Sequence, residues 1–157
     1  MLKVYDAIAH ISGSDLAPDV HGSVKFLGVP EGSWVEAEIF GLPDFAAKTP
    51  QTPQIGPFAF HIHEHDTCGS RHTDSPFAAA GGHWNPTGDQ HGNHAGDFPV
   101  LFSNGGTAKM LFFTDRFMPE DVIGRSVIIH QSPDDYTTQP SGSGGRRIAC
   151  GSIESAI

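Results

Sequence analysis

The sequence predicts an all-β fold in which short antiparallel strands form a sandwich or a barrel. Apolar and polar residues alternate in several short runs, which is the pattern of a half-buried strand. Turn-forming residues separate these runs and are abundant, with 19 glycines and 12 prolines in 157 residues. Helical periodicity is not sustained anywhere in the chain, so long helices are not expected.

The expected strands follow one another along the whole chain. In residues 4–11, alternate positions would form one mostly apolar face and one face that carries polar side chains. Residues 35–39 alternate more regularly between apolar and polar residues. Asn104-Gly105 lies between two apolar runs and is a strong hairpin signal, because both residues tolerate positive φ. Further short strands are expected at residues 23–27, 61–63, 108–113, 126–130 and 147–153.

Two long stretches do not have the pattern of strands. Residues 64–99 are rich in glycine, histidine, aspartate and threonine, and residues 131–145 are rich in serine, glycine, proline and aspartate. Loops of this length in a compact domain are usually functional and need something to hold them. We therefore expect two long functional loops.

Length and charge restrict the class of protein. A chain of 157 residues is expected to form a single domain over residues 1–157. The net charge of −9 leaves no cationic face for nucleic acid. No apolar run approaches the roughly 20 residues of a membrane span. Asp6 and His10 interrupt the N-terminal stretch in which a signal peptide would have its apolar segment. The chain is expected to be soluble, without a membrane span, and to lack its signal segment.

The two cysteines fall in different parts of the predicted fold. Cys68 lies in the first long loop and Cys150 in the last expected strand. A disulfide between them would attach the loop to the barrel, while two unrelated buried thiols are the alternative. A zinc–thiolate site is less favoured, because such sites usually contain closely spaced cysteine pairs.

Histidine is the outlier of the composition, with ten residues. In His61-Ile62-His63, alternation on a strand places both imidazoles on one face, where they can bind a single ion. The potential ligands form an imidazole-only group and a group with a carboxylate, which suggests copper for the first ion and zinc for the second. In chain order these potential ligands are His61, His63, His83, His91, His94, Asp97 and His130.

From about residue 58 to the C-terminus the chain resembles the copper-zinc superoxide dismutase family in its bacterial form. The resemblance implies an antiparallel Greek-key β-sandwich, or flattened eight-stranded barrel, with two long functional loops. It also implies dismutation of the superoxide anion at a copper and zinc centre. The motifs that carry it are Phe60-His61-Ile62-His63-Glu64, Gly82-His83-Trp84-Asn85-Pro86, His94-Ala95-Gly96-Asp97, Gly124-Arg125-Ser126-Val127-Ile128-Ile129-His130 and Gly145-Arg146-Arg147-Ile148-Ala149-Cys150-Gly151.

The resemblance implies a role for each matching residue. The implied copper ligands are His61, His63, His83 and His130. The implied zinc ligands are His83, His91, His94 and Asp97, so that His83 bridges the two ions and takes part in catalysis. Arg147 matches the arginine that attracts the anionic substrate, and Cys68 and Cys150 match the disulfide. Asp134 matches the aspartate that orients His61 and His91 through their other ring nitrogens.

The sequence departs from the family at two places. His91 and His94 are only three positions apart, so the zinc loop must turn tightly, with Gly92 as the flexible residue. The loop after His130 is short and lacks lysines, so guidance of the substrate depends on Arg147, together with Arg146.

The remaining singled-out residues have simpler interpretations. The other histidines are expected at the surface, Arg125 in the support of a loop, and several aromatic residues in the core. These histidines are His10, His21, His65 and His72, and the aromatic residues are Phe58, Phe60, Phe112 and Phe113.

Two other functions compete with the dismutase. A mononuclear zinc hydrolase leaves His61, His63 and His130 without a role. A protein that stores or delivers copper and zinc on the same fold is the stronger alternative. A homodimer is common in the family, although a monomer is also possible. The expected disulfide and the bacterial resemblance favour an extracytoplasmic location.

Overall fold

The computed structural model of the chain describes residues 4–157. Within them the chain forms seven strands and two short helical turns, η1 (Ala78–Ala80) and α1 (Pro119–Val122). The strands are β1 (Ala7–Gly13), β2 (His21–Val29), β3 (Gly32–Phe40), β4 (Phe60–His63), β5 (Ala108–Thr114), β6 (Ser126–His130) and β7 (Arg147–Ser155).

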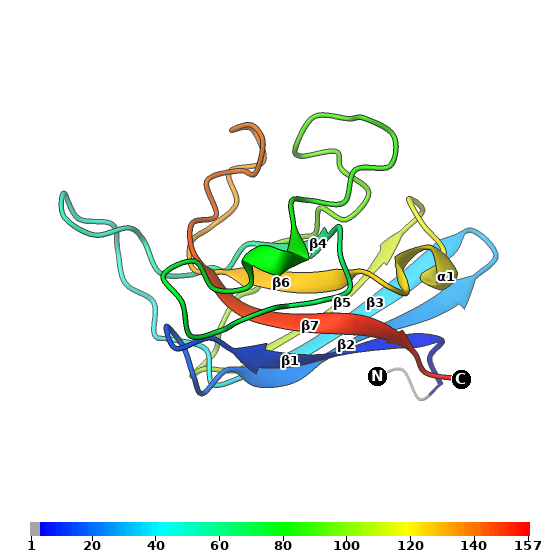
Figure 1. Cartoon of the computed structure of the whole chain (residues 1–157), viewed down its shortest axis with the longest axis horizontal. Coiled ribbons are helices and arrows are strands. Elements are labelled where there is room, and N and C mark those ends of the chain that lie inside the picture. The colour runs from blue at the N-terminus through cyan, green and yellow to red at the C-terminus, as the bar shows by residue number, and fades with distance from the viewer. Residues whose placement is uncertain (1–3) are drawn as a thin grey trace.

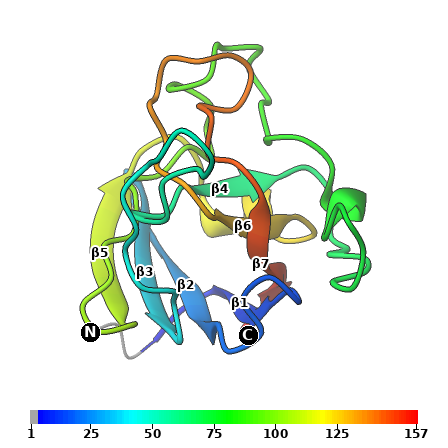
Figure 2. The same ribbon diagram turned by 90° about the vertical axis from the view of Figure 1, so that its left-hand side faces the viewer.

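The seven strands form one antiparallel sheet in the order β4-β6-β7-β1-β2-β3-β5. The sheet curls into a half-barrel (Figures 1 and 2). The connections β3–β4 and β5–β6 cross between its two edges, which gives the Greek-key character. Residues 96–101 run alongside residues 58–62, with hydrogen bonds such as those between Phe58 and Leu101. They lie where an eighth strand would lie. The predicted fold class is confirmed.

The concave side of the sheet holds the core, because the inward residues of each strand are apolar. Phe58 and Phe60 are fully buried, as predicted, and Phe112 is partly buried and packs against the core beside Phe98. Phe113 is an exception to the prediction. It points outward from the edge strand β5, is 43% exposed and meets the ring of Trp34 at 5.7 Å. The first strand also begins later than predicted, at Ala7.

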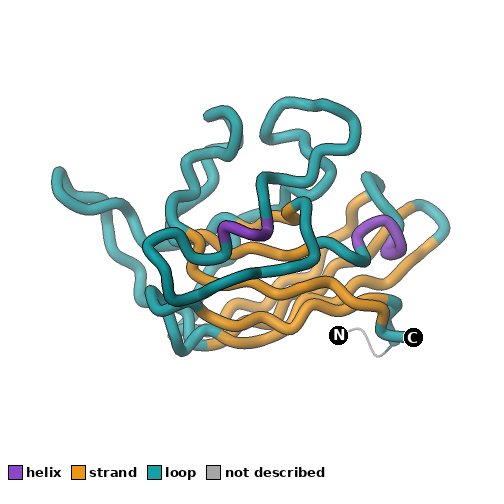
Figure 3. The backbone as a smooth tube through the Cα atoms, viewed as in Figure 1, coloured by secondary structure: helices purple, strands orange, loops and turns teal. Residues whose placement is uncertain are grey.

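Loops make up a large part of the molecule (Figure 3). The two predicted loops stand close together beyond β4 and β6 (Figure 1). They are joined by hydrogen bonds such as that from the Tyr136 hydroxyl to the Phe98 carbonyl, 2.9 Å. A third long excursion, residues 41–59, was not predicted. It is the β3–β4 crossover and folds back on itself at the Ala46–Ile55 bridge.

Cys68 and Cys150 form a disulfide that attaches the first functional loop to β7, so the alternative of two separate thiols is wrong. Around it, Phe77, Ala80 and Ile128 form a small apolar cluster of their own. Neither helical turn within residues 4–157 has the length or the apolar character to cross a membrane.

Candidate metal centre

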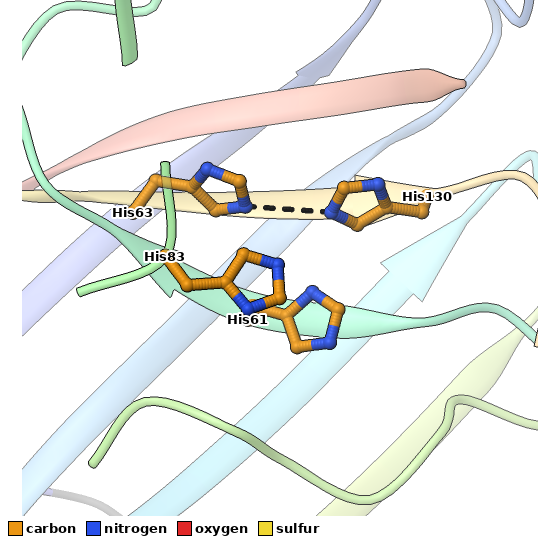
Figure 4. A group of neighbouring side chains, drawn as sticks. All are labelled: His61, His63, His83 and His130. Atoms are coloured by element: carbon orange, nitrogen blue, oxygen red, sulfur yellow. Dashed lines mark hydrogen bonds between the residues drawn. The ribbon is translucent and has the colours of Figure 1, made fainter. Parts of the chain in front are cut away.

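The histidines meet because several backbone elements converge beside β4. Alternation along β4 points His61 and His63 to the same side, and β6 ends at His130 on the neighbouring strand. His83 is brought to them by its bridge with His63. Figure 4 shows the four imidazoles facing one another, although they come from three segments far apart in the sequence. The loop residues His91, His94 and Asp97 lie beside this group.

Two of the rings turn unprotonated nitrogens toward each other. His63 Nδ1 donates to the Gly81 carbonyl at 2.9 Å, and His130 Nδ1 donates to the Gly145 carbonyl at 3.1 Å. A carbonyl can only accept, so in each neutral ring the proton is on Nδ1 and Nε2 has a lone pair. These two Nε2 atoms are 3.4 Å apart. Two acceptors at this distance favour a cation between them.

Asp134 holds two further rings with its two carboxylate oxygens. Its Oδ2 accepts from His61 Nε2 at 2.6 Å and its Oδ1 accepts from His91 Nε2 at 2.8 Å. Each ring therefore has its proton on Nε2 and a lone pair on Nδ1. The side chains of all three residues are completely buried. Asp134 thus fixes the orientation of one ring in each predicted metal set.

The carboxylate of Asp97 gathers the second set. Its Oδ2 is 3.2 Å from His91 Nδ1, and its Oδ1 is 3.4 Å from the Nδ1 atoms of both His83 and His94. The Nδ1 atoms of His83 and His94 are themselves 3.3 Å apart. His83 therefore presents Nδ1 to this set, while its Nε2 is buried without a hydrogen-bond partner.

The structure contains two groups of potential metal ligands, and within each group the ligand atoms all lie within 4.8 Å of one another. The first contains His61, His63, His83 and His130, which are the four predicted copper ligands. The second contains His61, His83, His91 and Asp97, so it has His61 in place of the predicted His94. We retain His94, because its Nδ1 is as close to Asp97 as that of His83 is.

The charge states suit metal binding. Burial lowers the pKa of His61 and of His63 well below the ordinary value, and neighbouring imidazoles lower it further. Burial also lowers the pKa of His130 to about 4 and reduces that of His94. Burial alone would raise the pKa of Asp97, but the nearby His83 imidazole and the hydrogen bond from the Gly92 N–H outweigh it and lower that pKa. Near neutral pH these groups are therefore neutral imidazoles and a carboxylate, the forms that bind metals.

Most of the buried polar atoms without hydrogen-bond partners belong to the predicted ligands. Within residues 4–157, five buried side-chain nitrogen or oxygen atoms have no hydrogen-bond partner, and only Ser126 Oγ lies outside the predicted ligands. Unpartnered buried polar atoms are costly, so their concentration at one place indicates a bound group. Four imidazoles suit copper, and three imidazoles with one carboxylate suit zinc. The other four atoms are His61 Nδ1, His83 Nε2, His91 Nδ1 and Asp97 Oδ1.

A cleft of about 420 Å³ reaches this group, and Arg147 lies in its wall together with His63, His83 and His130. The Arg147 guanidinium donates to the carbonyls of Phe77 at 2.9 Å and Gly81 at 2.6 Å, so the first loop fixes its position. Arg146 is more exposed, donates to the Asp74 carbonyl at 3.0 Å and lines an adjoining hollow.

The other predicted positions are separate from the centre. Arg125 supports a loop as predicted, since it donates to the carbonyls of Asp121 and Glu64 and stacks over Trp84. The four histidines expected at the surface are exposed: His10, His21, His65 and His72.

Three residues around the ligands were not singled out from the sequence. Gln139 and Arg116 form hydrogen bonds to residues 91–94. Gly142, with a φ of 75°, lies so close to Asp134 that a Cβ there would be 1.9 Å from Oδ1. None belongs to a ligand-like spacing, so only the contacts in the folded chain reveal them.

Comparison with known proteins agrees with this centre. The family described as "Copper/zinc superoxide dismutase (SODC)" matches residues 20–153. A superoxide dismutase [Cu-Zn] of Deinococcus radiodurans is 34% identical over 155 residues, covering 87% of this chain and 79% of that protein. One from Photobacterium leiognathi is 35% identical over 143 residues, covering 83% and 80%.

Among solved structures, the Cu/Zn superoxide dismutase of Brucella abortus superimposes with a TM-score of 0.73 at 27% identity. The match covers 95% of this chain and 100% of that one. The sequence match, the curled antiparallel sheet and the paired histidine sets all lead to one conclusion: the chain belongs to the copper/zinc superoxide dismutase family.

Proposed function

We propose that this protein is a superoxide dismutase with copper and zinc as cofactors, in which His61, His63, His83 and His130 hold copper and His83, His91, His94 and Asp97 hold zinc. The overall reaction converts two superoxide anions and two protons into dioxygen and hydrogen peroxide. One observation carries the ligand assignment: the Nε2 lone pairs of His63 and His130 face each other, and the Nδ1 lone pair of His91 faces the Asp97 carboxylate, with no proton between the two atoms of either pair.

Copper, when bound, supplies a centre that accepts and returns one electron, and zinc supplies a fixed charge beside it. His83 is the residue common to both sets. Its Nδ1 is held near His94 and Asp97, and its buried Nε2 faces the copper set. In the proposed mechanism, Nε2 takes up a proton and donates it to the peroxide product, while the contacts at Nδ1 keep the ring in place.

Arg147 is the proposed anion-binding residue. Its two carbonyl partners leave the guanidinium in the cleft wall beside His63 and His130. A positive group held at this place attracts superoxide and orients it at the opening of the centre. The rigid attachment to Phe77 and Gly81 means that no side-chain rearrangement is needed before substrate binds.

The test combines metal analysis with turnover. Wild-type protein loaded with both ions is expected to contain one copper and one zinc per chain and to dismutate superoxide in a xanthine oxidase and cytochrome c assay. His83→Ala should lose turnover even when its copper content is restored. The exposed-histidine variant His72→Ala should keep wild-type activity. Full turnover in copper-loaded His83→Ala would remove the proposed role of this residue.

Three further properties are proposed for the whole chain. Residues 1–157 form a single domain, supported by one continuous sheet and core. An extracytoplasmic location is supported by the disulfide and by the bacterial relatives. A homodimer is proposed from the family resemblance, and equilibrium sedimentation of the metal-loaded protein would test it.

A further inference from the structure

We infer that Arg116 and Gln139 are positioning residues that brace the short zinc loop at its middle and at its first residue and prepare it to bind zinc. This inference rests on the proposed function, since it takes His91, His94 and Asp97 as zinc ligands. The zinc loop is defined here as residues 91–97. It turns within a few residues, and Gly92 adopts a φ of 98° in it.

Arg116 holds the middle of the loop, at Asn93 and His94. Its Nη1 donates to the His94 carbonyl at 3.0 Å, and its Nη2 donates to Asn93 Oδ1 at 2.9 Å. The His94 N–H in turn donates to Asp97 Oδ2 at 2.9 Å. Both peptide groups of His94 are therefore fixed, which sets the position from which its ring reaches toward His83 and Asp97.

The base of the Arg116 side chain is itself anchored. The next residue, Phe117, is 4% exposed and packs its ring against those of Phe26, Trp84 and Phe98. The Phe117 carbonyl also accepts from the Ser33 hydroxyl at 2.8 Å. No carboxylate within residues 4–157 forms an ion pair with Arg116, so its observed side-chain bonds are those to the zinc loop.

Gln139 holds the first residue of the loop, His91. Its Oε1 accepts from the His91 N–H at 2.7 Å, and its Nε2 donates to the His91 carbonyl at 3.1 Å. A second bond from Nε2 to the Thr137 carbonyl, 3.0 Å, fixes the amide of Gln139. Asp134, from the same long loop, holds the His91 ring at Nε2. Backbone and ring of this ligand are thus both set by residues 131–145.

The two braces explain how so short a loop can present three ligands. The Nδ1 atoms of His91 and His94 lie close to the Asp97 carboxylate. Nitrogen lone pairs and carboxylate oxygens are all partially negative, so they repel one another when no cation lies between them. Bonds from outside the loop supply the energy that holds the ligands together before zinc arrives. Residues that support metal ligands in this way typically change metal affinity by about 10- to 100-fold when they are removed.

The experiment measures zinc affinity of the apo-protein by competition with a chromogenic chelator. Arg116→Ala is expected to weaken zinc binding by about 10- to 100-fold. Arg116→Lys keeps the charge but cannot reproduce the planar two-donor contact, so it should recover only part of the loss. Arg71→Ala removes an exposed arginine outside the brace and should bind zinc as tightly as wild type.

Cobalt(II) provides a spectroscopic readout at the zinc position. Its visible bands depend on the ligand geometry, so Arg116→Ala should alter them while Arg71→Ala should not. Gln139→Glu retains an acceptor for the His91 N–H but loses the donor to its carbonyl, and should show a similar change. Circular dichroism identifies any variant that fails to fold, in which case the two conservative variants, Arg116→Lys and Gln139→Glu, decide the question.

Zinc affinities of folded Arg116→Ala and Gln139→Glu within twofold of wild type would overturn the brace. So would an equal loss in Arg116→Ala and Arg71→Ala, because that would reduce the effect to overall charge. A wild-type protein that takes up neither zinc nor cobalt at this place would instead overturn the proposed zinc set itself, and the brace with it.

Discussion

Asp134 joins the two metal sets through a single carboxylate. It accepts from His61 on one side and from His91 on the other, with all three side chains buried. Both rings depend on it for the tautomer that leaves Nδ1 with a lone pair. One side chain therefore orients a ring in each of the two proposed metal sets.

Asp134→Asn should weaken the binding of both metals by about 10- to 100-fold. The amide has one oxygen that can accept and one nitrogen that cannot, so only one of the two imidazoles keeps its acceptor. Metal content after dialysis against a chelator measures the effect. Asp135→Asn is the control, because the side chain of that exposed neighbour bonds Thr137 and Thr138 and none of the ligands. Equal metal retention in both variants would contradict the role of Asp134.

The buried histidines also predict how the apo-protein responds to acid. The pKa of His130 is about 4 in the folded state and 6.5 in the unfolded reference, so between these values the unfolded chain binds more protons. Stability is therefore highest above pH 6.5 and falls as the pH decreases toward 4, by about 3 kcal/mol from this residue. His61 and His63 act in the same direction.

Urea unfolding of apo-protein across this pH range tests that dependence. His130→Gln should flatten the curve, while the exposed-histidine variant His72→Asn should leave it unchanged. Asp97, whose lowered pKa lies below its ordinary 3.8, contributes only at lower pH. Stability that stays constant from pH 7 to pH 4.5 would show that these imidazoles can be protonated in the folded chain.

The disulfide links the first functional loop to β7, and the same loop holds the proposed anion-binding residue Arg147. It closes a segment with a sequence separation of 82 residues. The same loop provides the Phe77 and Gly81 carbonyls that hold Arg147. The covalent link and the arginine contacts thus act on one segment, so the loss of the disulfide should affect both stability and turnover.

Cys68→Ser combined with Cys150→Ser should lower the free energy of unfolding by about 4.5 kcal/mol in the chain-entropy model. The remaining folded protein should have a lower rate of dismutation, because the loop that positions Arg147 is then less restrained. Denaturant unfolding and steady-state assays measure the two effects. The pair Ser12→Ala and Glu154→Gln controls for substitution on β1 and β7 at side chains that do not bond the first functional loop. Unchanged stability in the double cysteine variant would contradict the prediction.

Strand positions could be predicted where the sequence has an alternating run or a short continuous apolar run. Residues 126–130 form β6 as predicted, since a continuous apolar run ends at a histidine. Phe113 was placed wrongly, because an edge strand exposes one of its faces and apolar residues there do not reveal which face it is. The excursion at residues 41–59 was missed because a crossover between sheet edges depends on tertiary topology.

The candidate ligands could be proposed from strand alternation and motif resemblance, but the orientation of their rings could not. The sequence places two imidazoles of one strand on one side, and motif resemblance supplies the rest. The nitrogen that each ring presents depends on partners such as Gly81 and Gly145, which are distant in sequence. Arg116 and Gln139 are single polar residues in irregular segments, so no pattern marks them.

The protein as a whole carries a charge of the same sign as its substrate. The net charge is −9 and superoxide is an anion. At roughly 0.1 M salt the Debye length is about 10 Å, so distant carboxylates are screened while Arg147 and bound metal ions act at contact range. Local attraction in the cleft should therefore exceed the repulsion from the rest of the surface.

This balance can be tested by the sign of the salt dependence. If attraction in the cleft dominates, kcat/KM of the wild type decreases as ionic strength rises; if net charge dominates, it increases. Arg147→Glu should lower kcat/KM at least about tenfold at low salt and reverse the sign, because repulsion then outweighs the attraction of the bound metal ions. Lys48→Glu makes the same change of charge on the exposed excursion at residues 41–59 and should preserve the wild-type sign. A rate that rises with salt in the wild type, or equal losses in the two variants, would mean that Arg147 does not direct the approach of superoxide.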